Sequence, residues 1–198
     1  MKNYLLALSL AMTLAGCSFL PEPEPAPKQL QLTRLASDPV ITPANQAPLR
    51  LVVERPQAPL PLQQRDIWYS EQPFQLQAYS RYLWTEGLDR QLQRLVSEFL
   101  AAQPWTASVA LDTPGIHSDL RLRLTLHHWY LNVPQQKLML SLQMNLLDSQ
   151  GRSLLQRNWQ SEEPVTPLSP LGFAAASQTW LEAWAQELAE LLINVENH

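Results

Sequence analysis

The chain has 198 residues, with 14 basic against 18 acidic side chains and a formal net charge of −4. A weakly acidic chain lacks the electrostatic footprint of a nucleic-acid-binding protein, so we expect no nucleic-acid partner. With one cysteine the fold cannot rest on disulfide bonds, and the length suits one folded domain with a tail.

The amino terminus has the order of parts of a secretory signal. The mostly apolar run Tyr4–Leu14 ends in the small pair Ala15-Gly16. Its eleven residues are too few to span a bilayer, which takes about 20. The single cysteine, Cys17, follows the small pair, and the stretch Leu14–Ser18 resembles a bacterial lipobox. We therefore expect residues 1–16 to be a lipoprotein signal peptide and Cys17 to be acylated; the alternatives are an ordinary cleavable signal and a short buried helix.

Acylation of Cys17 predicts a protein that is tethered to a membrane without spanning it. Two or more acyl chains hold a protein on a bilayer almost permanently, since each buried CH₂ group contributes about 0.8 kcal/mol. Ser18 stands where an inner-membrane lipoprotein usually carries Asp. By resemblance to lipoprotein sorting in two-membrane bacteria, we expect the outer membrane, on its periplasmic face.

Residues 17–48 have the composition of a linker that follows the lipidated cysteine. The alternating prolines of Pro21–Pro27 favour an extended polyproline II conformation of about 3.1 Å per residue, which would hold the domain off the membrane. Within this stretch, Gln29–Leu32 alternates briefly and predicts a short edge strand. We therefore expect the folded domain to comprise residues 49–198.

The first half of this domain predicts short strands followed by a helix. Strands are expected at Leu49–Glu54, Asp66–Tyr69 and Phe74–Tyr79, where apolar runs are bounded by prolines. Asp89–Ala102 has apolar residues at helical spacing and polar residues on the opposite side, which indicates an amphipathic helix ending before Pro104.

The second half contains the strongest signal, which is a long alternation of apolar and polar residues. After an expected strand at Trp105–Leu111, leucines alternate with polar residues from Leu120 to Leu126, and a second alternation runs from Leu138 to Leu146. A turn at Asp148–Gly151 leads to a third strand, Arg152–Gln160, so an antiparallel meander is expected. These strands have one apolar face, which predicts a sheet with one buried side.

A final amphipathic helix is expected after a proline-rich break, with Ser169 as its cap and Pro170 in its first turn. Two amphipathic helices need an apolar surface, and the meander offers one. The fold class is therefore α+β: a two-layer domain in which two amphipathic helices pack on one face of a largely antiparallel sheet.

Motifs that carry chemistry are missing from the sequence, which has no G-x-G-x-x-G, P-loop, H-E-x-x-H or G-x-S-x-G pattern. Neighbours on a strand point to opposite faces, so His127 and His128 could not ligate one metal ion without a bulge. We expect His127 to be outward and polar, and His128 to be inward and hydrogen-bonded. Glu182, Glu187 and Glu190 fit the wet face of a helix. The expectation is a protein that is not an enzyme, with no catalytic residue, metal or cofactor.

The residues from Asp66 to Trp84 resemble the auxiliary lipoprotein family of ABC-type transporters. The resemblance consists of an Ile-x-Tyr strand ending at Tyr69 and a Tyr-x-x-x-x-Trp segment from Tyr79 to Trp84, and it continues through the strand at Leu120, the Asp148–Arg152 turn and the last helix. The chain departs from the family where Thr85-Glu86-Gly87 replaces a proline that often follows the Trp. It departs again around Leu30–Leu35, where the usual tyrosines are absent.

The resemblance implies a non-catalytic subunit that docks a periplasmic lipid-transport assembly to the outer membrane. Its partners would be a mammalian-cell-entry (MCE) domain protein and, through it, an ABC permease and ATPase. The alternatives are a stand-alone envelope lipoprotein that binds lipid or peptidoglycan, and an unrecognised periplasmic hydrolase.

A partner surface is expected where large aromatic and arginine side chains lie together on the outer face. Trp68-Tyr69 and Trp129-Tyr130 are adjacent aromatic pairs, so one ring of each pair should be outward. With Arg121 and Arg123 nearby, such a surface has the composition of a protein interface and would also suit a homo-oligomer. The alternative is that loops or a neighbouring strand cover these rings as ordinary core. The predicted interface residues are Trp68, Tyr69, Arg121, Arg123, Trp129 and Tyr130.

Overall fold

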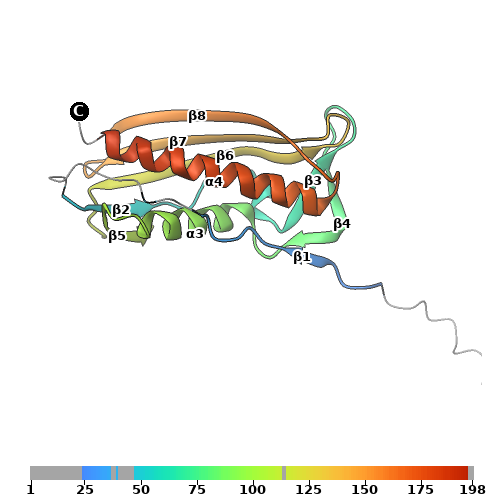
Figure 1. The fold of residues 1–198 in the computed structure, drawn as a ribbon, viewed down its shortest axis with the longest axis horizontal. Coiled ribbons are helices and arrows are strands. Elements are labelled where there is room, and N and C mark those ends of the chain that lie inside the picture. The colour runs from blue at the N-terminus through green and yellow to red at the C-terminus, as the bar shows by residue number, and fades with distance from the viewer. Residues whose placement is uncertain (1–23, 37–38, 40–46, 113–114, 196–198) are drawn as a thin grey trace, which may run out of the picture.

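The computed structural model describes residues 24–36, 39, 47–112 and 115–195. The expected signal peptide and Cys17 lie outside these residues. The described chain forms one eight-stranded sheet with helices (Figure 1). None of the helices in this part of the chain is long and apolar enough to cross a bilayer.

The backbone of the sheet is the antiparallel meander of β6 (Leu120–Asn132), β7 (Lys137–Asp148) and β8 (Ser153–Pro164). The leucines of β6 from 120 to 126 are buried, and so are the apolar residues of β7 that alternate from Leu138 to Leu146. Gly151 has a φ of 79° in the turn between β7 and β8, a conformation that glycine adopts without strain. The predicted meander is confirmed.

The other edge of β6 is shared by two short strands, so the sheet forks there. β2 (Leu49–Val53) pairs in parallel with the beginning of β6, and β3 (Asp66–Ser70) pairs in parallel with its end. Between them the chain hydrogen-bonds to β6 through the backbone of Glu54 and Gln57 and then forms the short helix α2 (Leu60–Gln63). β5 (Thr106–Leu111) extends the β2 branch, whereas β4 (Gln77–Trp84) and β1 (Lys28–Leu30) extend the β3 branch.

Part of the expected linker packs with the domain. β1 pairs in parallel with β4 at the edge of the sheet, so the brief alternation at 29–32 does mark an edge strand. Just beyond it, Leu32 and Leu35 are buried in the core. The packed structure therefore includes residues 28–35, upstream of the start at Leu49 that the prolines suggested.

The third short strand begins later than expected. Phe74 was predicted to start it, but β4 begins at Gln77, and Phe74 lies in the preceding turn with a φ of 65°. Pro73 followed by a residue with positive φ is the pattern of a type II turn, and the amide of Gln75 lies 3.4 Å from the carbonyl oxygen of Gln72. Phe74 is therefore a turn residue.

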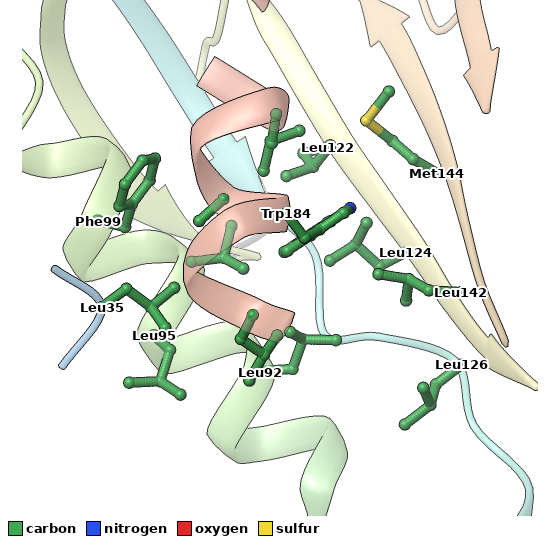
Figure 2. Close-up of a cluster of buried hydrophobic side chains, with 14 of the residues drawn as sticks. Leu35, Leu92, Leu95, Phe99, Leu122, Leu124, Leu126, Leu142, Met144 and Trp184 are labelled. Atoms are coloured by element: carbon green, nitrogen blue, oxygen red, sulfur yellow. The ribbon is translucent and has the colours of Figure 1, made fainter. Parts of the chain in front are cut away.

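Both long helices lie on the same side of the sheet, α3 (Leu88–Ala101) beside α4 (Pro170–Val195) (Figure 1). The hydroxyl of Ser169 accepts a hydrogen bond from the amide of Gly172, as expected of the cap. Figure 2 shows the core: Trp184 of α4 lies among leucines of α3 and apolar residues of β6 and β7, with Leu35 against α3. The two-layer α+β fold is confirmed.

Gly87, which stands in the place of the family's proline region, allows α3 to start against α2. A Cβ atom at this position would lie 2.2 Å from the carbonyl oxygen of Gln63. Only glycine fits such a close backbone approach. The replacement of the family's proline by a segment that contains Gly87 thus has a local structural reason.

Candidate functional site

The helices leave the opposite face of the meander uncovered, and this outer face is the candidate site. Its central rows are rich in uncharged polar side chains, because the residues that alternate with the buried leucines of β6 and β7 point this way. Thr125, Gln143 and Asn158 form one row across the three strands, and Arg123, Asn145 and Gln156 form the next. These amides offer hydrogen-bond donors and acceptors to a partner.

The two predicted interface arginines lie at the β2 end of this face, and both are paired with carboxylates. Arg123 makes a two-point contact with Glu54, with donor–acceptor distances of 2.7 and 3.1 Å. Arg121 donates to Asp112 at 2.9 Å and to Glu54 at 3.4 Å. The hydrogen bond that Arg123 donates to Glu54 raises the pKa of Arg123. These guanidinium groups are charged but already matched, so they would orient a partner more than attract one.

A β-bulge in β6 changes the expected positions of the two histidines. The register between β6 and β7 shifts between Leu126 and His128, so both histidines lie against one residue of β7. His127 is exposed, with Nε2 3.4 Å from Oε1 of Gln143, and His128 lies 5.9 Å from the Tyr130 ring. The expectation of an inward His128 is therefore wrong, since the extra residue turns both histidines to the outer face.

The bulge lies where α2 replaces a neighbouring strand, and together they form a small cavity. Pro61, Trp68, His128 and Tyr130 are among the residues that line this cavity of about 70 Å³. The indole of Trp68 donates to the carbonyl oxygen of Pro61 at 3.0 Å, which fixes the ring against α2. Trp68 and Tyr130 are thus brought together, as the predicted interface requires.

Trp129 must be removed from the predicted interface. It is 1% exposed, and its indole nitrogen donates at 2.9 Å to the hydroxyl of Ser177 in α4. The bulge shifts the alternation by one residue, so Trp129 faces Leu140 on the helix-covered side. Tyr130 is then the outward ring of this pair, and Trp129 belongs to the core, where α4 covers it instead of the loop or neighbouring strand of the alternative.

Tyr69 lies apart from Trp68, at the end of the sheet. Its ring centroid is 4.4 Å from that of Tyr79, and its hydroxyl contacts Gln77 at 3.0 Å. The six predicted residues therefore do not form one patch: the arginines lie at one end of β6, Trp68 and Tyr130 at the bulge, and Tyr69 beyond them.

The surroundings of the bulge favour the neutral form of the His128 imidazole. Burial lowers the pKa of His128, and the neighbouring charge of His127 lowers it further. Among the described residues, no three potential metal-ligating side chains lie close enough to hold one ion. The bulge can donate and accept hydrogen bonds, and its rings offer apolar contact.

Sequence reasoning missed the turn residue Phe74, whose side chain is fully exposed, and the neighbouring Leu76, which is 51% exposed. Both were expected inside a strand. The proline at position 73 is the available signal, because proline followed by a residue that adopts positive φ indicates a tight turn.

The chain is similar to known proteins in its sequence family and in its fold. A family model described as ABC-type transport auxiliary lipoprotein component matches residues 31–189. A crystal structure of a DUF330-family protein from Xanthomonas campestris is 20% identical, with a TM-score of 0.74 over 86% of this chain and 97% of that one. Another crystal structure, of an uncharacterized protein, is also 20% identical, with a TM-score of 0.64 over 84% and 97%. No curated protein matches.

Proposed function

Because the chain belongs to the family of ABC-type transport auxiliary lipoproteins, we propose that it is the outer-membrane docking subunit of an MCE-type lipid-transport system. In this role it holds the periplasmic transport assembly to the membrane by its acylated Cys17 and carries no catalytic side chain. The match over residues 31–189 is the observation that carries the proposal.

The arrangement of the domain supports a docking role. The face covered by α3 and α4 is apolar and buried, whereas the outer face exposes amides, matched arginines and the cavity between Trp68 and Tyr130. Aromatic rings beside polar, hydrogen-bonding surroundings are typical of protein interfaces. We assign the MCE-type partner to this face, centred on the bulge of β6.

Site-specific photo-crosslinking in native membranes tests the docking face. A photoreactive residue is placed at Gln143, beside the bulge on the outer face, and a matched one at Glu190, on the exposed side of α4. The proposal expects crosslinks from position 143 to an MCE-domain protein and none from position 190. Crosslinks from position 190 alone would move the interface to the helices, and crosslinks to peptidoglycan alone would favour a stand-alone envelope lipoprotein.

The anchor is tested separately by Cys17→Ala. We expect this variant to take up no label from a fatty acid analogue and to leave the outer-membrane fraction. If the variant is still labelled, the anchor assignment is wrong.

A further inference from the structure

One end of the sheet is defined by a row of paired residues, Ser70, Asn132, Lys137 and Pro164, which are neighbours from β3 to β8. Beyond this row lie the turn that carries Phe74, the turn between β6 and β7, and the segment that leads into α4 (Figure 1). We call this the Phe74 end.

Exposed apolar side chains gather at the Phe74 end. Of the eight large hydrophobic residues that are exposed among the described residues, four belong to it, in the turn before β4 and at the start of α4. These are Phe74, Leu76, Leu168 and Leu171. The rings of Tyr69 and Tyr79 lie 4.4 Å apart near the start of β4, and Tyr130 lines one hollow with Phe74; tyrosine is suited to a boundary between apolar and wet surroundings.

The conformation of Phe74 has no explanation inside the domain. Its φ of 65° is a region that bulky side chains avoid, and asparagine or glycine would fit the turn with less strain. Its side chain reaches no buried surroundings, because the residue is fully exposed. The backbone of Phe74 is strained, and its exposed ring adds no contact that would stabilise the fold. A residue of this kind indicates a contact with another molecule.

The membrane tether leaves the domain at this same end. β1 is parallel to β4, and β4 begins at the Phe74 end, so residues 24–27, which precede β1, run toward this end (Figure 1). Residues 17–27 can span at most roughly 40 Å when fully extended. The domain is of similar length, since the 26 residues of α4 span about 39 Å. An acylated Cys17 thus keeps the Phe74 end, and not the opposite end, near the bilayer.

We propose that the Phe74 end docks on the bilayer that holds the anchor, with Phe74 inserted among the lipid headgroups and acyl chains. This inference rests on the lipid anchor of the proposed function. The charged side chains at this end are mainly acidic, since Lys137 pairs with Glu162 at 2.9 Å while Glu71 adjoins the turn and Glu163 precedes Pro164, so they do not attract anionic lipid. Docking is therefore driven by apolar burial and depends little on salt or on anionic lipid.

The test uses the lipidated chain reconstituted in vesicles of phosphatidylethanolamine and phosphatidylglycerol. Because acylated Cys17 has no free thiol, Gln75→Cys supplies a unique labelling site in the turn, and Gln150→Cys supplies a matched site in the turn between β7 and β8. An environment-sensitive fluorophore at each site is quenched by spin-labelled lipid or by aqueous iodide. We expect lipid quenching and iodide protection at position 75, and the reverse at position 150.

The variant Phe74→Asn isolates the ring from the fold. Asparagine tolerates positive φ, so the domain should remain folded. We expect the fluorophore at position 75 to report an equilibrium constant for docking on the bilayer that is about tenfold lower in this variant. Most of the burial of one aromatic ring in the bilayer is then lost.

The outcomes separate this inference from the anchor. If the protein floats with the vesicles while position 75 stays open to iodide, docking is overturned and the anchor stands. If it does not float, the anchor fails and docking fails with it. Protection that occurs in native membranes but not in lipid vesicles also overturns the inference, and it assigns the turn to a protein partner.

Discussion

The two faces of β6 differ in how far their side chains are buried in the core. On the inner face, Leu122 and Leu124 are almost completely buried beside α3, α4 and β7 (Figure 2), and Trp129 is 1% exposed. On the outer face, the side chains are polar and partly exposed, and Arg121 and Arg123 are held by Glu54 and Asp112. The inner face therefore carries the stability, and the outer face is left free for contact with other molecules.

The contrast between the two faces is tested most strongly at Trp129-Tyr130, where adjacent rings lie on opposite faces. Trp129→Ala removes a buried ring and the donor to Ser177, so we expect a loss of about 3–5 kcal/mol in the free energy of unfolding. Tyr130→Ala removes a partly exposed ring and should cost about 1 kcal/mol. Urea denaturation of both variants measures this contrast. Equal losses would mean that the two faces contribute equally to stability.

A second test concerns a charge on the helix side. Asp89 is 1% exposed in the first turn of α3, and its carboxylate accepts a 2.6 Å hydrogen bond from the half-exposed Arg55. Arg55→Met leaves a buried carboxylate without its partner, so we expect a loss of about 3 kcal/mol. The double variant Arg55→Met, Asp89→Leu should recover most of this loss, because no charge then remains buried. Urea unfolding of the single and double variants gives the comparison, and a double variant as unstable as the single one would contradict it.

On the outer face, the largest expected electrostatic effect on stability comes from Glu54, which pairs with both interface arginines. Glu54→Gln should cost about 1 kcal/mol, because its carboxylate is only partly exposed and makes a two-point contact with Arg123. The loss should shrink at 1 M salt, where the screening length is about 3 Å. Lys137→Gln, which removes an exposed pair with Glu162, is the matched control and should change stability by under about 0.5 kcal/mol.

Local periodicity predicted most of the fold. Side-chain direction and burial repeat every second residue from Leu120 to Leu126 and from Leu138 to Leu146, as the sequence pattern indicates. The amphipathic helices followed from the same kind of pattern. The parallel neighbours β2 and β3 were not predicted as such, because their pairing with β6 joins segments about 60 to 70 residues apart in the chain and leaves no local signal.

The candidate site was predicted less well because one bulge reverses the faces of its residues. Up to Leu126 the alternation places residues correctly, but the inserted residue turns His128 outward and Trp129 inward. The bulge lies beside α2, which interrupts the strands on that edge, and nothing in the local sequence of β6 marks the interruption. The acylation of Cys17 is the strongest functional prediction from the sequence. It depends on the lipobox motif alone and remains a prediction.

The smallest expected effect, on the pH dependence of stability, tests the bulge itself. Burial lowers the pKa of His128 in the folded protein below its value in the unfolded chain, and His127 adds to this. Between the two pKa values the unfolded chain binds more protons, so stability falls as the pH is lowered from about 6.5, the ordinary histidine value. The contribution of His128 is fully present above that pH and is lost as the pH falls through the folded pKa.

Replacing His128 by glutamine should therefore flatten the decrease in stability below pH 6.5, with little change at pH 8. His117→Gln is the control, because that side chain is exposed and lies outside the bulge. Urea midpoints measured from pH 8 to pH 5 give the comparison. A His128→Gln profile that keeps the full acid decrease, parallel to the His117→Gln profile, would mean that the bulge leaves His128 as free to protonate as in the unfolded chain. Because His127 contributes to the lowered pKa, His127→Gln should flatten the decrease by a smaller amount, which separates the charge of the neighbour from burial beside Tyr130.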